Sequence, residues 1–316
     1  WIKKFYPELK GIPITNCKHH EAHAAAGILT APDSFDNATI MTIDAIGEFD
    51  TASIWRWKDG KLKKIDSVKF PSSLGLFYSA MTAHVGLKPM EDEYVLMGMA
   101  AYGEPHFADA MSTEFFVDSK CTESSNVIAM KKNLQRGVPK SYLGRDEQSG
   151  IDEYGHTKID YHIAASAQAI AEKRIFEYAR QALIMTNSEN LVFMGGCALN
   201  CVANSNLFTL FKNVHIMPNP GDAGSSLGAA ALHAYNTTGT KVNWTGPFLG
   251  NNIEGKYPIK KALESLLNGE VFGIANGPAE FGPRALGNRT LSADPRGPHI
   301  KDKVNKIKLR QEFRPF

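Results

Sequence analysis

Residues 190–204, NLVFMGGCALNCVAN, contain the strand-to-helix turn that decides the fold. An apolar run reaches the glycine pair Gly195 and Gly196, and the segment that follows, 201–211, has helical character. Residues 213–230, NVHIMPNPGDAGSSLGAA, repeat the order of short strand, glycine-bearing loop and small-residue helix. Strands that end in such loops, each followed by a helix, predict an α/β fold with ligand-binding loops at the ends of the strands.

The segments before this turn fit the same fold. Residues 38–44, ATIMTID, form a short apolar run that predicts a buried strand. Residues 51–70 alternate around an Asp-Gly pair and predict a hairpin. Helices are expected at 72–86 and at 161–185, the second with an amphipathic pattern. The polar, irregular stretch 105–156 is expected to be an insertion or a substrate-facing region.

The composition changes near residues 244–254, a Gly-, Pro- and Asn-rich stretch that we interpret as a linker. Beyond it lies a second unit with a helix, a strand at 270–276 and the motif EFGPRALGNRTLSADPR at 280–296. A chain of 316 residues is long enough for two domains. We therefore expect domains at 1–248 and 249–316. We interpret both as partial, because the chain starts without methionine and stops directly after a patterned segment.

The composition is ordinary for a globular protein, with 43% hydrophobic and 22% charged residues. A net charge of +2 without a long basic block does not indicate a nucleic-acid surface. No apolar run approaches the roughly 20 residues that span a bilayer, and no signal peptide opens the chain. Cys17, Cys121, Cys197 and Cys201 include no CxxC pair, so neither a zinc ribbon nor a disulfide framework is indicated. We expect a cytoplasmic protein that binds neither nucleic acid nor membrane.

Residues 16–27, NCKHHEAHAAAG, contain a candidate metal site. His19 and His23 are four residues apart, so on a helix they lie on one face and can bind one ion together. Asp44 ends one predicted strand, and Asp222 lies between another strand and its helix. Two histidines and two carboxylates suit a divalent ion such as Fe(II), Mn(II) or Zn(II).

Other interpretations of these residues stay open. A zinc-protease HExxH motif is absent, because position 24 is Ala24. The histidines could mark the start of a surface helix, although the alanines after them favour close packing. Asp222 could act only as a helix N-cap, and Asp44 has the same ambiguity.

The glycine pair and two asparagines form a candidate nucleotide site. Gly195 and Gly196 let the backbone approach a ligand closely, and the helix that follows offers free N–H groups to a phosphate. Asn200 and Asn204 are four residues apart and could hydrogen-bond a ribose or a phosphate. The alternative is a turn that serves tight packing alone.

Basic residues in the second unit predict an anion site, because guanidinium forks suit phosphate and carboxylate groups. The set is Arg284, Arg289, Arg296, Lys308, Arg310 and Arg314. A solvated basic face is the alternative for residues 301–310. The arginines of the motif could instead pin the domains together through Glu280 and Asp294.

Eight stretches of the chain resemble one known family. They are HHEAHAAAG, TIDAIGE, SSLGLFYSAMTAHVG, EYVLMGMAAYG, GGCALNCVAN, PNPGDAGSSLGAA, EFGPRALGNRTLSADPR and IKLRQEFRPF. Their order is similar to that in the NodU/CmcH-type O-carbamoyltransferases, over nearly the whole chain. The resemblance implies an actin/hexokinase-like (ASKHA) domain without its N-terminal strand, followed by the beginning of a YrdC-like α/β domain.

The resemblance also implies a reaction. In this family carbamoyl phosphate and ATP give carbamoyl-adenylate, whose carbamoyl group moves to a hydroxyl of a small-molecule or saccharide acceptor. The positions that match the family's Fe(II)-type ion site are His19, His23, Asp44 and Asp222. The GGCALN loop matches the nucleotide-binding loop, and the basic residues match the start of the domain that handles carbamoyl phosphate.

His20 and Glu48 are our candidates for the base that deprotonates the acceptor hydroxyl. The chain departs from the family pattern at Ala45, where glycine is usual, and at Val95, where lysine is frequent. Because position 95 is valine, no residue of this chain matches that lysine of the family, and its role is left in doubt.

Two functional alternatives stay open. One is a threonylcarbamoyl- or hydrogenase-maturation-type transferase on the same scaffold. The other is a non-catalytic ASKHA module that binds nucleotide and metal. Because the first phosphate loop and most of the YrdC-like domain are missing, this chain alone is not expected to complete the reaction.

Overall fold

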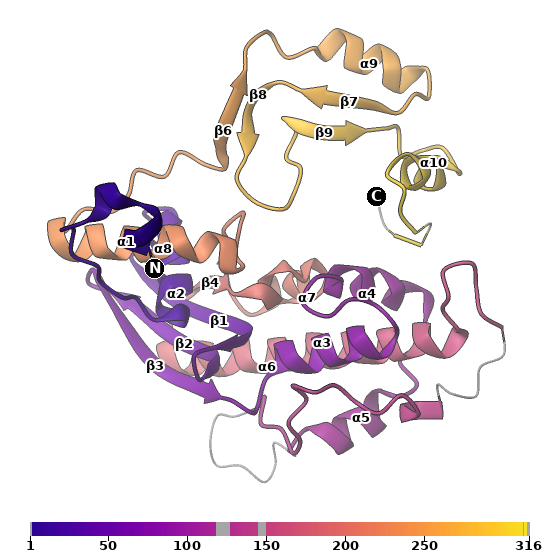
Figure 1. Cartoon of the computed structure of the whole chain (residues 1–316), viewed down its shortest axis with the longest axis horizontal. Coiled ribbons are helices and arrows are strands. Elements are labelled where there is room, and N and C mark those ends of the chain that lie inside the picture. Colours follow the sequence, from indigo (N-terminus) through magenta and orange to yellow (C-terminus); the bar gives the residue numbers. More distant parts are fainter. Residues whose placement is uncertain (1, 118–126, 145–149, 312, 315–316) are drawn as a thin grey trace.

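The computed structural model describes residues 2–117, 127–144, 150–311 and 313–314 (Figure 1). Cys121 and parts of the predicted insertion at 105–156 lie outside the described residues. The chain forms a larger N-terminal part around one sheet and a smaller C-terminal part with two short sheets.

The central sheet has five strands in the order β3-β2-β1-β4-β5. Strand β1 (Asn37–Gly47) pairs in parallel with β4 (Asn190–Met194), which pairs in parallel with β5 (Asn213–His215). On its other side β1 pairs antiparallel with β2 (Asp50–Lys58). The predicted α/β class is confirmed, and the two glycine-bearing loops follow β4 and β5 at one edge of the parallel strands.

The predicted hairpin is formed by β2 and β3 (Lys61–Lys69). Asp59 and Gly60 connect the strands with φ angles of 51° and 69°. Two successive positive φ angles are what a tight type I′ hairpin turn requires, which explains the Asp-Gly pair.

Each face of the sheet builds its own hydrophobic core, because side chains alternate between the faces. Met41 of β1 and Phe193 of β4 belong to one core, whereas Ile40 and Val192 belong to the other. The second core is covered by α2 (His19–Thr30) and α8 (Asp222–Thr238), both rich in alanine. Most of α2 is buried, so the surface-helix alternative for the histidine stretch is wrong.

The first core is covered by helices that include both predicted ones. They are α3 (Leu74–His84), α4 (Glu93–Met99), α5 (Ala108–Phe115) and α6 (Lys158–Thr186). Helix α6 begins with a capping box, in which Thr157 and Asp160 bond reciprocally, and it ends at Asn187 in the left-handed conformation. Short elements complete this part: α1 (Ile2–Phe5), η1 (Pro7–Leu9), η2 (Ala100–Tyr102) and η4 (Tyr142–Gly144).

The helix predicted at 201–211 is shorter than expected. The structure has η5 (Gly196–Leu199), α7 (Cys201–Ser205) and η6 (Asn206–Thr209) in this region. The hydroxyls of Ser205 and Thr209 donate to the carbonyls of residues three positions earlier. Such local bonds compete with a continuous helix, so the segment breaks into short turns.

The C-terminal part consists of two antiparallel strand pairs and two helices. Strand β6 (Phe248–Ile253) pairs with β8 (Gly277–Glu280), and β7 (Phe272–Ala275) pairs with β9 (Arg289–Ser292). The linker prediction for 244–254 is therefore wrong over β6, because pairing with a distant strand orders it. The helices are α9 (Ile259–Leu267) and α10 (Ile300–Ile307).

Aromatic contacts join the two parts. Phe281 packs edge-on against Trp244, with ring centroids 6.2 Å apart. Phe313 is buried and contacts a set of rings in the N-terminal part: Tyr102, Tyr154, His156 and Tyr161. These ring contacts place Phe313 beside η2 and the start of α6.

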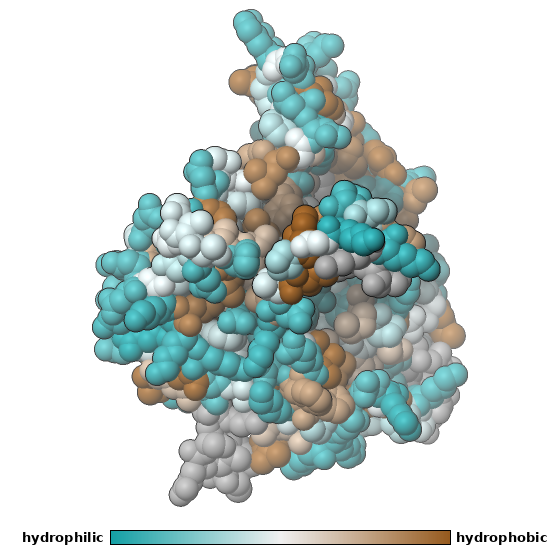
Figure 2. Space-filling view, turned by 60° about the vertical axis from the view of Figure 1, so that its left-hand side comes forward, coloured by the Kyte–Doolittle hydropathy of each residue, from teal (hydrophilic) through white to brown (hydrophobic). Residues whose placement is uncertain are grey.

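The surface in Figure 2 is mostly hydrophilic, with separate apolar patches. None of the helices in the described part of the chain combines the length and hydropathy of a membrane-spanning segment.

Candidate metal centre and nucleotide loop

Four side chains from three elements converge on one point. His19 and His23 come from the first two turns of α2, Asp44 from β1, and Asp222 from the start of α8. The Nε2 atoms of the two histidines are 3.1 Å apart. Asp44 Oδ2 lies 3.1 and 3.0 Å from them, and Asp222 Oδ1 lies 3.3 and 3.2 Å from them. One ligand atom from each residue lies within 4.8 Å of all the others.

The five separations of 3.0 to 3.3 Å that involve a histidine fit a first-row metal ion. With metal–ligand bonds of roughly 2.1 Å, adjacent ligand atoms are about 3.0 to 3.4 Å apart in octahedral or tetrahedral geometry. The convergence that we expected from the sequence is present. That an ion binds there stays a prediction.

Burial and the neighbouring charges have opposite effects on the pKa values of His23 and Asp44. His23 is fully buried and Asp44 is 9% exposed, whereas the side chain of Asp222 is 72% exposed. Burial opposes the charging of His23, but hydrogen bonds with Asp222 and Asp44 outweigh it and raise its pKa to about 9. Burial also opposes the charging of Asp44, but the hydrogen bonds with His19 and His23 hold its pKa far below the ordinary value. Two carboxylates around two imidazoles thus form a negative pocket that suits a cation.

The capping alternative for Asp222 does not match its contacts. Gly221 occupies the N-cap position of α8, and no side-chain cap bond forms there. The carboxylate of Asp222 contacts the histidines instead.

Of the two candidate bases, His20 lies beside the cluster, with its ring centroid 5.7 Å from that of His19. His20 is 2% exposed, and its Nδ1 contacts the hydroxyls of Thr42 and Ser53 at 2.6 and 3.0 Å. Burial lowers the pKa of His20 to about 4, so it is neutral at pH 7 but a weak base. Glu48 lies on the exposed turn after β1 with a φ of 60°.

The glycine pair after β4 lies directly against the end of β1. Gly195 has a φ of 91°, and a Cβ built on it would lie 2.3 Å from the carbonyl oxygen of Ile43. A Cβ on Gly196 would lie 3.1 Å from Asp44 Oδ1. The packing alternative therefore applies to Gly195, while Gly196 brings the predicted nucleotide loop next to the four-residue cluster.

The two asparagines are used differently from our prediction. Asn200 caps α7 by accepting from the N–H of Ala203 at 3.1 Å, and its amide pairs with that of Gln168. Its side chain is thus occupied within the protein instead of free for a ribose. Asn204 donates to the carbonyl of Ala198 at 2.7 Å, which holds the same loop, and its Oδ1 is buried without a partner in the described structure.

The arginines of the 280–296 motif have separate hydrogen-bond partners. Arg284 donates to the carbonyl of Leu199 at 3.2 Å and so joins the C-terminal part to the glycine loop. Arg289 donates to four backbone carbonyls of its own unit, at 2.8 to 3.1 Å: those of Asn251, Asn276, Gly277 and Asn288. The contacts of Arg289 therefore favour a role in the fold. Arg296 pairs with Asp294 over two residues, not across the domains.

Glu280 stabilises the same turn as Arg289. Its carboxylate accepts from the backbone N–H groups of Leu286, Asn288 and Arg289 at 2.8 to 3.0 Å. The alternative that Glu280 pins the domains together is thus replaced by a local role within the motif.

Lys308, Arg310 and Arg314 form a separate cationic cluster after α10. Burial, followed by repulsion from Arg310 and Arg314, lowers the pKa of Lys308. Arg314 lies over the ring of Tyr94 in α4, 4.5 Å from its centroid. Next to Tyr94, Val95 is 2% exposed within the core, so no cation comes from that position of α4.

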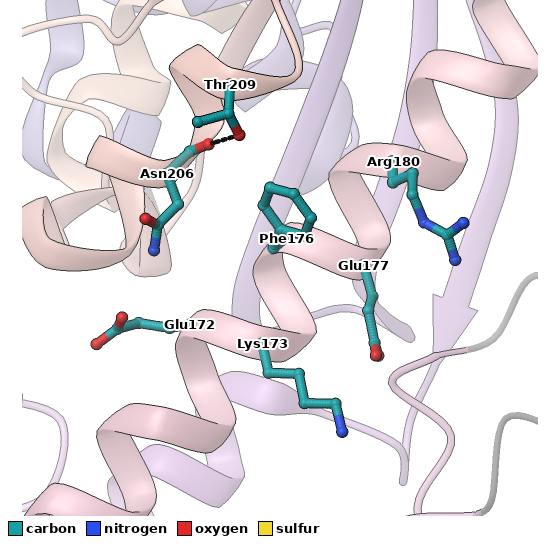
Figure 3. A pocket seen from close by; sticks show the side chains of 7 residues that line it. All are labelled: Glu172, Lys173, Phe176, Glu177, Arg180, Asn206 and Thr209. Atoms are coloured by element: carbon teal, nitrogen blue, oxygen red, sulfur yellow. Dashed lines mark hydrogen bonds between the residues drawn. The ribbon is translucent and has the colours of Figure 1, made fainter.

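A surface groove between α6 and η6 is a separate feature (Figure 3). It is lined by Glu172, Lys173, Phe176, Glu177, Arg180, Asn206 and Thr209. None of the predicted site residues lines it.

Two residues that shape the site were not predicted from the sequence. Gly47 packs against the first histidine, because a Cβ there would lie 2.3 Å from His19 Cδ2. Gln168 holds Asn200. The sequence carried two signals for these residues: a glycine at the end of an apolar strand and a glutamine on the apolar face of a helix.

Comparison with family models decides the identity of the chain. The model of the carbamoyltransferase N-terminus matches residues 6–231, and the model of the carbamoyltransferase C-terminus matches residues 263–316. The chain belongs to the carbamoyltransferase family. The resemblance inferred from the motifs is confirmed at this level.

Individual relatives agree with this assignment. The uncharacterized protein sll1178 of Synechocystis sp. is 34% identical over 96% of this chain and 54% of its own. Nodulation protein NolO of Bradyrhizobium diazoefficiens is 31% identical, over 94% of this chain and 57% of its own. The 3'-hydroxymethylcephem-O-carbamoyltransferase of Amycolatopsis lactamdurans is 28% identical, over 97% and 60%. This carbamoyltransferase chain spans between 54% and 60% of the length of these three relatives.

Proposed function

We propose that the full-length protein is an O-carbamoyltransferase with an ASKHA domain and a YrdC-like domain. In this proposal, carbamoyl phosphate, ATP and water give carbamoyl-adenylate, phosphate and pyrophosphate. The carbamoyl group is then transferred to a hydroxyl of a small molecule or saccharide, and AMP leaves. The family assignment supports the reaction class, and the name of the Amycolatopsis relative specifies O-carbamoyl transfer for that protein.

One observation carries the proposal: the four-residue cluster lies directly beside the glycine loop. His19, His23, Asp44 and Asp222 converge, and Gly196 places the loop backbone against Asp44. We propose that the cluster holds a divalent ion, Fe(II) in our assignment, and that the loop binds the nucleotide. When bound, such an ion supplies Lewis-acid stabilisation of negative charge.

The side chains of this protein then have distinct tasks. The loop, held by Gly195 and tied to Arg284, orients the nucleotide beside the cluster. The cationic cluster of Lys308, Arg310 and Arg314 attracts the phosphate groups of carbamoyl phosphate and ATP. His20 and Glu48 stay the candidates for accepting the proton of the acceptor hydroxyl. Of the two, His20 needs a local opening to reach a substrate, because it is buried.

The test uses the full-length protein loaded with Fe(II) under anaerobic conditions. We expect AMP formation from ATP that depends on carbamoyl phosphate, and a carbamoyl ester detected by mass spectrometry when ¹³C-labelled carbamoyl phosphate and a hydroxyl acceptor are supplied. Binding of ATP and metal without any carbamoyl-phosphate-dependent AMP formation would instead support the non-catalytic alternative. A label found only on a nitrogen or sulfur atom of the acceptor would contradict O-carbamoyl transfer.

A further inference from the structure

A buried glutamine lies in the middle of the long helix α6. Gln168 is 5% exposed, and the helix positions around it are apolar and buried, including Ala164, Ala167 and Ala171. Burying an amide is unfavourable unless its donors and acceptors are paired. The partners of this side chain therefore show what it does.

All four hydrogen-bonding positions of Gln168 are used. Its Oε1 accepts from the hydroxyl of Tyr78 at 2.7 Å and from Asn200 Nδ2 at 2.9 Å. Its Nε2 donates to Asn200 Oδ1 at 3.0 Å and to Glu172 Oε1 at 2.9 Å. An amide has two donor hydrogens and two acceptor lone pairs, so Gln168 is fully satisfied. Two of the four bonds form a reciprocal amide pair with Asn200.

Asn200 connects Gln168 to the glycine loop. The residue follows η5 directly, and its Oδ1 also accepts from the N–H of Ala203 to cap α7. One end of the loop is thus set by Gly195 packed against Ile43, and the other by the amide pair. Gly196, which faces Asp44, lies between these two fixed points.

We propose that Gln168 is a positioning residue for the nucleotide loop, and that it acts through Asn200. This inference rests on the proposed nucleotide-binding role of the loop. Without the pair, the amide of Asn200 is free to rotate away from Ala203, and the backbone that carries the Leu199 carbonyl, which accepts from Arg284, loses a support. Binding groups lose efficiency when their supporting contacts no longer fix them to within about 0.5 Å.

Two further residues support Gln168. Tyr78 of α3 donates its hydroxyl to the amide oxygen, and the carboxylate of Glu172, which can only accept, fixes the orientation of the amide. Glu172 lies one turn after Gln168 and extends to the side of α6 on which Asn206 lies (Figure 3). These hydrogen bonds thus connect Tyr78 in the core with Glu172 at the groove, and Gln168 in their middle also binds Asn200 at the end of the glycine loop.

The main variant is Gln168→Met, which keeps an unbranched side chain of similar length and removes every polar bond. The matched control is Ser166→Ala in the same helix. Ser166 is fully buried and bonded to the N–H of Phe107 and the carbonyl of His162, away from the loop. Tyr78→Phe is a milder variant that leaves the amide pair intact and keeps the test possible if Gln168→Met folds poorly.

Two measurements on the full-length protein decide the proposal. Hydrogen exchange of the amides at 196–205 should become at least about tenfold faster in Gln168→Met, and the affinity for a non-hydrolysable ATP analogue should fall about tenfold. Tyr78→Phe should shift both in the same direction by a smaller factor. Ser166→Ala should leave both unchanged. Metal content should stay at the wild-type value in every variant, because Gln168 does not contact the cluster.

A double variant tests whether Gln168 acts through Asn200. Gln168→Met should weaken analogue binding little further when it is added to Asn200→Ala, because the pair is already lost. Unchanged exchange of the loop in Gln168→Met and Tyr78→Phe, or an equal change in Ser166→Ala, would overturn the proposal. Faster exchange with unaltered affinity would reduce Gln168 to a purely structural role. If the wild type binds no nucleotide, the proposed function fails, while the exchange measurement still decides whether Gln168 fixes the loop.

Discussion

Gly196 leaves little room for a side chain toward Asp44, since a Cβ at this position would lie 3.1 Å from Asp44 Oδ1. Asp44 Oδ1 also accepts from the N–H of Ala45 at 2.8 Å, while Oδ2 faces His19 and His23. One carboxylate therefore connects the glycine loop with the candidate metal site.

Gly196→Ala is expected to weaken nucleotide and metal binding together. The added methyl group has to push Asp44 Oδ1 away by a few tenths of an ångström, which tilts Oδ2 relative to the histidines. We expect a several-fold loss of ATP-analogue affinity, with Gly196→Val blocking binding while the protein still folds. Calorimetry with the analogue and metal analysis check this prediction. Gly273→Ala in β7, where a Cβ meets nothing closer than 3.6 Å, is the control. Analogue affinity equal to wild type in Gly196→Val would remove the loop from the site.

Removal of one ligand should abolish tight metal binding. His23→Ala is expected to lower Fe(II) affinity by more than about 100-fold. Mutation of a residue that only supports a metal ligand already lowers metal affinity by about 10- to 100-fold. The measurement is metal content after anaerobic loading and desalting. His233→Ala, which changes an exposed histidine of α8, should retain the wild-type content. Full metal content in His23→Ala would contradict the four-ligand site.

Much of the N-terminal fold was predictable because its signals are local. The Asp59-Gly60 pair determines a hairpin, and helical spacing alone places His19 and His23 side by side. Parallel strands also bring their ends together, so Asp44 and the loop before Asp222 were expected at one edge of the sheet. These features can be predicted without knowing which residues distant in the sequence contact them.

The errors fall where a distant partner decides the outcome. Asn200 reads as a ligand contact until Gln168, 32 positions earlier in the chain, is seen to occupy its amide. Residues 248–253 read as a linker because the pairing with β8 is not visible in their composition. Arg289 reads as an anion ligand because carbonyl partners carry no sequence pattern.

His215 should make stability depend on pH. Burial lowers its pKa to about 4 from the ordinary 6.5, and its Nε2 is buried without a partner in the described structure. Between pH 6.5 and 4 the unfolded chain binds a proton that the folded protein does not, so stability falls as the pH falls. His215→Gln should remove up to about 3 kcal/mol of this loss. Urea unfolding at pH 7 and pH 5 measures it, with His233→Gln as the control. Parallel pH profiles of wild type and His215→Gln would contradict the assignment.

Arg289 and Lys308 should separate fold stability from anion binding in the C-terminal part. The guanidinium of Arg289 spans four carbonyl oxygens, which a lysine ammonium cannot reach at once. We therefore expect Arg289→Lys to lower the unfolding free energy by about 1 to 3 kcal/mol while KM for carbamoyl phosphate stays constant in the folded enzyme.

Lys308 is exposed and lies next to two other cations, so its charge contributes to the local potential rather than to packing. Lys308→Ala in the full-length enzyme should raise KM for carbamoyl phosphate several-fold without a change in melting temperature. The effect should shrink at high salt, because exposed charges are screened beyond roughly 3 Å at 1 M ionic strength. Thermal unfolding and steady-state kinetics on the same preparations check both variants. A raised KM for carbamoyl phosphate with normal stability in Arg289→Lys would contradict the structural role of Arg289 and indicate that it binds the anion.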